Sequence, residues 1–265
     1  MKKAFTITYV LVLILYVLPC TLLYLNQEDV IFFPQKLAAN HPFSFEQPFE
    51  EIAISTQDHT KLHGILFKAK KSKGLIFFLH GNAGSLATWG EIASVYTQLN
   101  YDIFMLDYRG FGKSEGNISN EEELLSDVQA SYNQLKERYP EPSIIVLGYS
   151  IGTGPAAWLA AHNHPQKLIL QAPYFSMVDM MQKRFSIVPT FLLKYKLETN
   201  RYLANCSMPI VLFHGDKDEV IPYESSLRLQ QFLKKGDTLI LLKGQKHNEI
   251  NLNSQYQQSI SSILP

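Results

Sequence analysis

The chain is poor in cysteine, carries no net charge and lacks a recognisable metal-binding motif. Its 265 residues include 24 basic and 24 acidic side chains, and this balance argues against a nucleic-acid partner, which would need a basic patch. The two cysteines are Cys20 and Cys206. Because Cys20 lies within an apolar run, we expect no disulfide framework and no signal of the redox compartment. The sequence has no H-E-x-x-H motif or comparable ligand set, so it predicts neither a metal site nor another cofactor.

A long apolar segment begins the chain. Residues 4–25 carry no charged side chain and are rich in leucine, valine, isoleucine and tyrosine. A bilayer span needs about 20 apolar residues, so residues 1–25 are predicted to be a single-pass transmembrane anchor. Two alternatives stay open. A cleaved secretory signal would need a small-residue cleavage site, which is not evident, and the proline before Cys20 fits a lipid-modified cysteine poorly.

The charges on either side of this segment indicate its orientation. Lys2 and Lys3 precede it, whereas Glu28 and Asp29 follow it. Positively charged flanks stay on the cytoplasmic side of a membrane. The sequence therefore predicts that the domain following the anchor lies on the non-cytosolic side.

The rest of the chain has about the length of one domain. We expect a juxtamembrane linker at residues 26–49 and a domain at residues 50–265 that includes a cap insertion at residues 174–206. Hydrophobic patterns predict strands at residues 50–56, 60–70, 75–79, 101–106, 143–147, 167–171, 209–213 and 238–242, and helices at residues 86–99, 120–139, 223–235 and from 249. Strands alternating with helices indicate an α/β fold with a mainly parallel sheet flanked by helices.

The most informative motif is the G-x-S-x-G sequence at residues 148–152. It follows an apolar strand and precedes a helical segment that begins near Gly154. A strand that turns sharply into a helix exposes the central serine above the sheet in a strained conformation, and flanking glycines let the two elements approach closely. A chance match would be a surface turn. The neighbouring strand and helix instead favour Ser150 as a nucleophile.

A nucleophilic serine needs a base, and the base needs an orienting acid. In hydrolases built on this turn, the acid and the histidine follow the serine in that order. Here Asp216 and Asp218 come after the strand 209–213, and His247 comes after the strand 238–242. The loops that follow parallel strands meet at one edge of the sheet. His247 is therefore the candidate base, and both aspartates lie in the loop that would supply the acid.

Acyl transfer also needs hydrogen-bond donors for the negative charge that develops on the carbonyl oxygen. Ile151, the residue after the serine, is expected to supply one backbone N–H. The second is expected from the glycine-rich loop after the strand 75–79, with Asn82 as the best candidate. This loop lacks the glycine spacing of nucleotide-binding motifs. The alternative is a plain turn between a strand and a helix.

Other polar residues beside these motifs are expected to be structural. Arg109 follows a buried strand within Asp-Tyr-Arg-Gly, and we expect it to pair locally rather than take part in catalysis. His80 and His214 each precede a glycine at a strand end. Structural hydrogen bonds are the expected role of these two histidines.

Together these motifs resemble the α/β-hydrolase superfamily and, more narrowly, its Bem46-like, serine aminopeptidase S33-type branch of membrane-attached hydrolases. The resemblance runs from about residue 50 to the C-terminus, and the cap matches weakly. The matching stretches are residues 79–84, 107–116, 148–152, 214–218 with 221–222, and 244–248, and residues 26–34 resemble the segment just after the membrane anchor in this branch. The resemblance implies an α/β-hydrolase fold with Ser150 as nucleophile, Asp218 as acid and His247 as base.

These features predict a membrane-anchored serine hydrolase that cleaves carboxylic esters or thioesters through an acyl-enzyme, with its catalytic domain facing away from the cytosol. The cap is rich in methionine and other apolar residues. Since methionine adapts to varied apolar shapes, the cap favours a small acyl-ester or lipid-like substrate, and ordinary core packing is the alternative. Two other functions stay open. An aminopeptidase would need an acidic group for the substrate amine, and a non-catalytic membrane scaffold would keep the fold alone.

Overall fold

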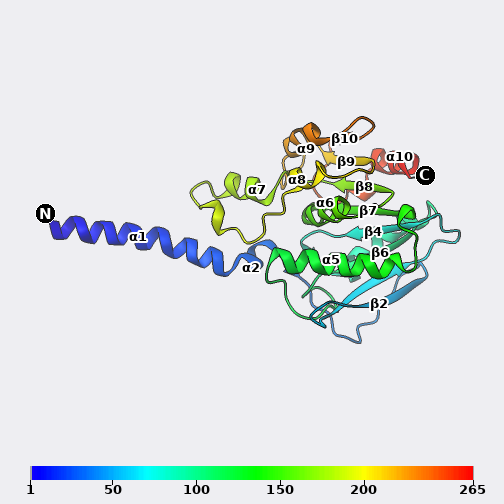
Figure 1. Cartoon of the computed structure of the whole chain (residues 1–265), viewed down its shortest axis with the longest axis horizontal. Coiled ribbons are helices and arrows are strands. Elements are labelled where there is room, and N and C mark those ends of the chain that lie inside the picture. The colour runs from blue at the N-terminus through cyan, green and yellow to red at the C-terminus, as the bar shows by residue number, and fades with distance from the viewer. Residues whose placement is uncertain (1, 265) are drawn as a thin grey trace.

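The computed structural model describes residues 2–264, and of residues 2–8, 10 and 11 it describes the backbone alone. Helix α1, Lys2–Leu25, extends away from a rounded domain formed by the rest of the chain (Figure 1). Within the described part of the chain, no helix is long and apolar enough to cross a membrane. The predicted anchor falls partly on side chains outside that part and stays a prediction.

An eight-stranded sheet forms the centre of the domain (Figure 1), with the order β10-β9-β8-β7-β4-β6-β3-β2. The strands are β2 Phe49–Ser55, β3 Lys61–Phe67, β4 Leu75–Leu79, β6 Asp102–Asp107, β7 Ile144–Tyr149, β8 Lys167–Gln171, β9 Ile210–Gly215 and β10 Thr238–Leu242. Strand β3 pairs antiparallel with both of its neighbours, and all other neighbours in this sheet are parallel. The predicted α/β fold with a mainly parallel sheet is confirmed.

Both faces of the sheet are covered by helices, and strand β4 shows how the sequence achieves this. All its residues are buried, as expected for a central parallel strand. Phe77 packs on the face covered by α5 (Glu121–Lys136) and α6 (Thr153–His162). The next residue, Phe78, packs on the opposite face among side chains of the helices α4 (Ala93–Thr97) and α10 (Ser254–Ile263). This alternation follows from the two-residue period of a strand.

Three predicted helices differ from those observed. The helix predicted at residues 86–99 is divided into α3 Leu86–Trp89, the 3-10 helix η1 Gly90–Ile92 and α4. The helix predicted at residues 223–235 ends early, as α9 Glu224–Leu229 and η5 Gln230–Phe232. The last helix was predicted to start near residue 249, but α10 begins at Ser254 after the 3-10 helix η6 Ile250–Leu252. Glu249 adopts a left-handed φ of 63°, which a right-handed helix cannot include.

The cap segment between β8 and β9 contains α7 Met177–Arg184, the 3-10 helix η4 Thr190–Leu192 and α8 Thr199–Leu203. Figure 1 shows α7 and the loop after it projecting from the domain on the side from which α1 extends. The hydroxyl of Tyr16 in α1 donates to the carbonyl oxygen of Ile187 in this loop. The cap and the N-terminal helix are therefore neighbours in space although they are far apart in the sequence.

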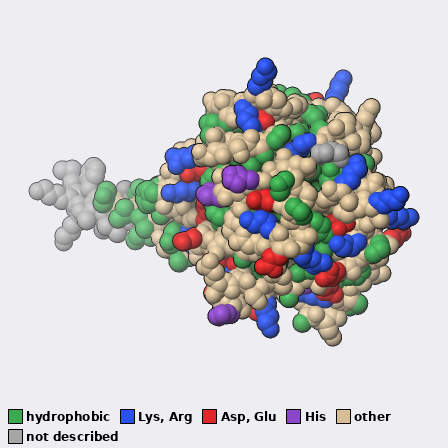
Figure 2. All heavy atoms as spheres, turned by 45° about the vertical axis from the view of Figure 1, so that its right-hand side comes forward, with side chains coloured by type: hydrophobic (Ala, Val, Ile, Leu, Met, Phe, Trp, Pro, Cys, Tyr) green, Lys and Arg blue, Asp and Glu red, His purple; other side chains and the backbone are tan. Residues whose placement is uncertain are grey.

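The outer surface carries charges of both signs. On the face shown in Figure 2, basic and acidic side chains are interspersed, and neither sign gathers into a single patch. This mixed distribution matches the zero formal net charge of the chain.

Candidate active site

Ser150 lies at the tight turn between β7 and α6, where the sequence predicted a strained nucleophile. Its φ is 53°, in the left-handed region that few residues other than glycine adopt. A Cβ on Gly152 would lie 2.2 Å from the carbonyl oxygen of Leu79, and one on Gly148 would lie 2.7 Å from the Cβ of Ala156. Both positions therefore require glycine for the strand, the turn and the helix to pack this closely.

The structure brings the predicted nucleophile, base and acid into one hydrogen-bonded chain. The Oγ of Ser150 lies 3.0 Å from Nε2 of His247. The Nδ1 of His247 lies 2.7 Å from Oδ2 of Asp218. Because an ionised carboxylate only accepts, Nδ1 carries the proton and Nε2 is left to accept from the serine hydroxyl. All three residues are at least 91% buried, with exposed fractions of 6%, 9% and 9% for Ser150, Asp218 and His247.

Asp218 is held in place by further donors. Its Oδ1 accepts hydrogen bonds from the backbone N–H groups of Val220 at 2.9 Å and Ile221 at 2.8 Å. Burial raises the pKa of Asp218, but contacts from His214 and His247 and the N–H of Ile221 outweigh it and hold the pKa well below its usual range. The carboxylate is therefore ionised at neutral pH and can stabilise a positively charged His247.

Asp216, the other aspartate of this loop, has different partners. Its Oδ1 accepts from the backbone N–H of Gly244 at 2.6 Å. This bond ties the loop after β9 to the loop after β10. Asp216 thus stabilises the loop arrangement, while Asp218 contacts the histidine.

The candidate oxyanion donors lie beside the serine. Asn82, Ser150 and Ile151 line one cavity of about 540 Å³. The hydroxyl of Tyr174 donates to the carbonyl oxygen of Ile151 at 3.1 Å, which fixes the peptide after that residue. Asn82, Ile151 and Ser150 thus line the same cavity, and the assignment of the two N–H groups as oxyanion donors stays a prediction.

The cavity itself is mostly apolar and is formed by three parts of the chain that are distant in sequence. The N-terminal helices, the cap and the sheet edge each contribute a wall. Its lining comprises Leu23, Tyr24, Gln27, Val30, Ile31, Phe33, Asn82, Ser150, Ile151, Tyr174, Met177, Met180, Met181, Arg184, Phe185, Val188, Leu192, Leu193, Glu219, Val220 and Ile221. The cap methionines therefore face a cavity that ends at the serine.

Some contacts of the site were not anticipated from the sequence. The hydroxyl of Tyr149 donates to the carbonyl oxygen of His247 at 2.7 Å and so fixes the loop that carries the base. His214, expected to be structural, does bond the carbonyl oxygen of Ile221 at 2.8 Å, but its Nε2 also lies 3.3 Å from Asp218. The sequence also did not predict that the N-terminal segment lines the cavity. The resemblance of residues 26–34 to the family segment after the anchor was the one indication of it in the sequence.

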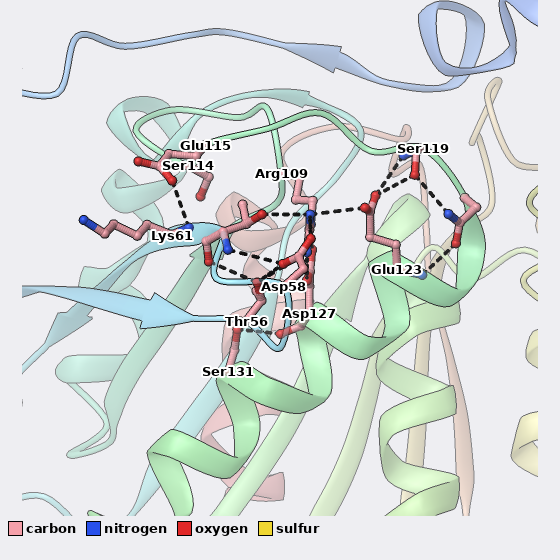
Figure 3. A network of polar contacts seen from close by, with 12 residues as sticks. Thr56, Asp58, Lys61, Arg109, Ser114, Glu115, Ser119, Glu123, Asp127 and Ser131 are labelled. Carbon is pink, nitrogen blue, oxygen red and sulfur yellow. Dashed lines mark hydrogen bonds and ion pairs between the residues drawn. The ribbon is translucent and has the colours of Figure 1, made fainter.

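Arg109 lies in a separate polar network, as Figure 3 shows. Its guanidinium bonds both carboxylate oxygens of Asp127, at 2.5 and 2.9 Å, and also contacts Asp58 at 2.7 Å. Asp58 belongs to the β2–β3 turn and Asp127 to α5, so the network joins these elements to the loop after β6. Arg109 is paired, as expected, but the pairing is not local, because Asp127 lies 18 residues away in the sequence and Asp58 lies 51 residues away.

Comparison with known proteins places the chain in a family. Residues 70–201 match the family described as serine aminopeptidase, S33. Alpha/beta hydrolase domain-containing protein 17C of Xenopus tropicalis is 32% identical over 211 residues, which cover 73% of this chain and 64% of that protein. Protein 17B of Xenopus laevis is 30% identical over 200 residues, covering 73% of this chain and 67% of that protein. The chain belongs to the α/β-hydrolase superfamily.

Solved structures show the same fold. An esterase of Pyrococcus furiosus aligns with this α/β-hydrolase at a TM-score of 0.70 and 19% identity, covering 88% of this chain and 97% of the esterase. An alpha-beta hydrolase of Vibrio vulnificus aligns at a TM-score of 0.68 and 21% identity, covering 81% and 80%. The predicted resemblance to the superfamily is thus confirmed. This α/β-hydrolase spans 64% of the length of the Xenopus tropicalis relative.

Proposed function

We propose that this α/β-hydrolase is a membrane-attached serine hydrolase that cleaves carboxylic esters or thioesters through an acyl-enzyme. The observation that carries the proposal is the hydrogen-bonded chain from Ser150 through His247 to Asp218. The serine end of this chain opens into an apolar cavity, which suits an acyl group.

Each residue has a defined step in this reaction. His247 takes the proton of Ser150 as Oγ attacks the acyl carbonyl carbon, and Asp218 stabilises the imidazolium that forms. The N–H groups of Ile151 and Asn82 bind the oxyanion of the tetrahedral intermediate. His247 then gives its proton to the leaving alcohol or thiol, and the acyl-enzyme remains. Water that loses a proton to His247 finally hydrolyses the acyl-enzyme and regenerates the serine.

Exposed apolar side chains of the cap support attachment to a lipid phase. The cap residues Ile187 and Phe191 are 76% and 80% exposed. The hydroxyl of Tyr16, within α1, donates to the carbonyl oxygen of Ile187 at 2.8 Å. The cap loop therefore lies against the segment predicted to be the anchor, and both would meet the same apolar phase.

An aminopeptidase is the second candidate function, and one observation favours it. Glu219 carries the one carboxylate among the described residues that line the cavity, and a carboxylate there could bind a substrate amine. However, its side chain is 76% exposed and lies 3.6 Å from the ammonium group of Lys246. A solvated carboxylate that already has a partner offers little affinity for an amine, so the ester substrate is favoured.

Covalent labelling tests the serine hydrolase chemistry directly. The full chain should react with a fluorophosphonate probe, and Ser150→Ala should abolish labelling and lower ester turnover by several orders of magnitude, because the three residues act as a unit. Circular dichroism should show the same fold for both proteins. Labelling that persists in a folded Ser150→Ala chain would refute Ser150 as nucleophile. A wild-type chain that is not labelled would instead support a non-catalytic membrane scaffold.

Chain-length dependence tests the substrate class. Across p-nitrophenyl esters from C2 to C12, kcat/KM should rise to an intermediate length, since each buried CH₂ contributes up to ~0.8 kcal/mol of binding until the cavity is full. For comparison, kcat/KM for aminoacyl anilides is measured with the wild type and with Glu219→Gln. Anilides hydrolysed faster than esters, with loss of that activity in Glu219→Gln, would establish the peptidase instead.

A further inference from the structure

The segment between α1 and the domain is an ordered part of the structure rather than a plain linker. It contains α2 Gln27–Ile31 and the short strand β1 Phe33–Pro34. Gln27 is 4% exposed and Phe32 is 5% exposed. Burial of an uncharged amide at this level requires hydrogen-bond partners, and Gln27 finds its partners in the cap. Ile31 and Phe33 contact the loop that carries Asn82.

On one side, the segment holds the candidate oxyanion residue. The backbone N–H of Phe33 donates to the carbonyl oxygen of Asn82 at 2.7 Å. The side-chain amide of Asn82 donates to the carbonyl oxygen of Ile31 at 3.0 Å. Strand β1 then pairs in parallel with β5, Ala83–Gly84. Asn82 is thus fixed through its main chain and its side chain by the same short segment.

On the other side, the segment holds the cap. The amide of Gln27 donates to the carbonyl oxygen of Leu192 at 2.7 Å and accepts from the backbone N–H of Lys194 at 2.9 Å. The carboxylate of Glu28 accepts from the hydroxyl of Tyr195 at 2.8 Å and contacts the ammonium group of Lys194 at 3.1 Å. Both residues therefore fasten the cap wall of the cavity to α2.

We propose that residues 27–33 are a positioning element of the active site, which sets the backbone N–H of Asn82 for the oxyanion and fixes the cap wall against which the acyl chain binds. The proposal rests on the serine hydrolase function proposed above. An oxyanion donor acts through its placement at about 2.7–3.1 Å from the developing charge. A small displacement of Asn82 therefore lowers the rate of acylation without weakening the binding of the ester.

Two substitutions in the full chain separate these roles. Asn82→Ala keeps the backbone N–H but removes the side-chain hydrogen bond to Ile31. Its matched control is Asn205→Ala, which removes a similar hydrogen bond from an exposed amide to the carbonyl of Arg201. Gln27→Leu removes both bonds to the cap. Its control is Gln134→Leu, which removes an exposed bond to the carbonyl of Ala53. Thermal unfolding of all four variants reports whether they fold.

The kinetic constants then distinguish positioning from folding. Asn82→Ala should lower kcat for p-nitrophenyl acetate by about tenfold to a hundredfold with KM nearly unchanged, part of the cost of losing a whole oxyanion donor. The same substitution should weaken the binding of a trifluoromethyl ketone inhibitor by the same factor, because this inhibitor binds as a tetrahedral oxyanion. Gln27→Leu should raise the KM for octanoate esters severalfold and leave the KM for acetate esters nearly unchanged. Both controls should match the wild type.

The outcomes separate this proposal from the proposed function. A wild-type chain that a fluorophosphonate does not label would overturn both. If the wild type is labelled and active, but Asn82→Ala and Gln27→Leu behave like Asn205→Ala and Gln134→Leu, the positioning role alone is overturned. Should Asn82→Ala fail to fold, the length-dependent KM of Gln27→Leu still decides whether the segment acts on the site.

Discussion

At the scale of single residues, the two aspartates after β9 show why local geometry matters. Both follow the same strand, and the sequence motifs alone placed both near the histidine. The structure gives Asp218 the contact with Nδ1 of His247 and gives Asp216 the N–H of Gly244. The turn after His214 accounts for the difference, since the backbone N–H groups of Val220 and Ile221 point at the carboxylate of Asp218.

We expect the two aspartates to respond very differently to loss of charge. Asp218→Asn should lower kcat by about 10⁴, because an amide holds His247 in the wrong tautomer. Asp216→Asn should lower kcat far less, since its carboxylate bonds a backbone N–H away from the histidine. Steady-state kinetics on a short ester measures both. A larger loss in Asp216→Asn than in Asp218→Asn would show that the acid is misassigned.

The sequence was sufficient to predict which polar residues meet at the edge of the sheet, because each of them follows a strand. Ser150, Asp218 and His247 each lie in the turn or loop that follows a recognisable apolar run, and parallel strands bring such positions to one edge. The contacts of Asn82 could not be derived in this way, because its partner Ile31 lies 51 residues earlier. Such pairing depends on how the segment after α1 returns to the sheet, which no local pattern encodes.

At the scale of elements, strongly patterned segments were predicted well and packed helices less well. The hairpin of β2 and β3 and the start of α5 follow local rules, and the side chain of Asn120 caps α5 by accepting from the N–H of Glu123 at 2.8 Å. The helix predicted at residues 86–99 is interrupted where a Cβ on Gly90 would lie 2.4 Å from the ring of Phe45. That contact belongs to tertiary packing and leaves no local pattern.

The Arg109 network is expected to stabilise the fold without taking part in catalysis. Arg109→Met would leave the carboxylate of Asp127, 2% exposed, without its charged partner, which should cost about 3–5 kcal/mol. The control Arg138→Met removes a partly exposed pair with Glu50 and should cost about 0–1 kcal/mol. Urea unfolding measures both losses. A kcat of folded Arg109→Met reduced more than severalfold would instead assign Arg109 a role in the reaction.

At the scale of the whole molecule, the order of strands and helices in the sequence predicted the fold. The sequence did not predict which distant segments come into contact. The domain buries a sheet between two layers of helices, as the alternating pattern requires. The cavity, by contrast, is closed by cap residues between Tyr174 and Leu193, by the end of α1 and by the segment after it. A cavity assembled from segments more than a hundred residues apart cannot be inferred from motif spacing.

Attachment of the molecule to a membrane is a prediction about the whole chain, because it would hold the cavity close to lipid. The full chain should stay in the membrane pellet after an alkaline carbonate wash, because residues 4–25 form an apolar segment without a charged face. A chain that begins at Asn26 should be released, although it retains the segment that contacts Asn82. Protease added to intact cells and to inverted vesicles identifies the side on which the domain lies, which we expect to be non-cytosolic. A mature protein that begins near residue 20 would show that the segment is a processed signal, and the cavity would then lack a tether to lipid.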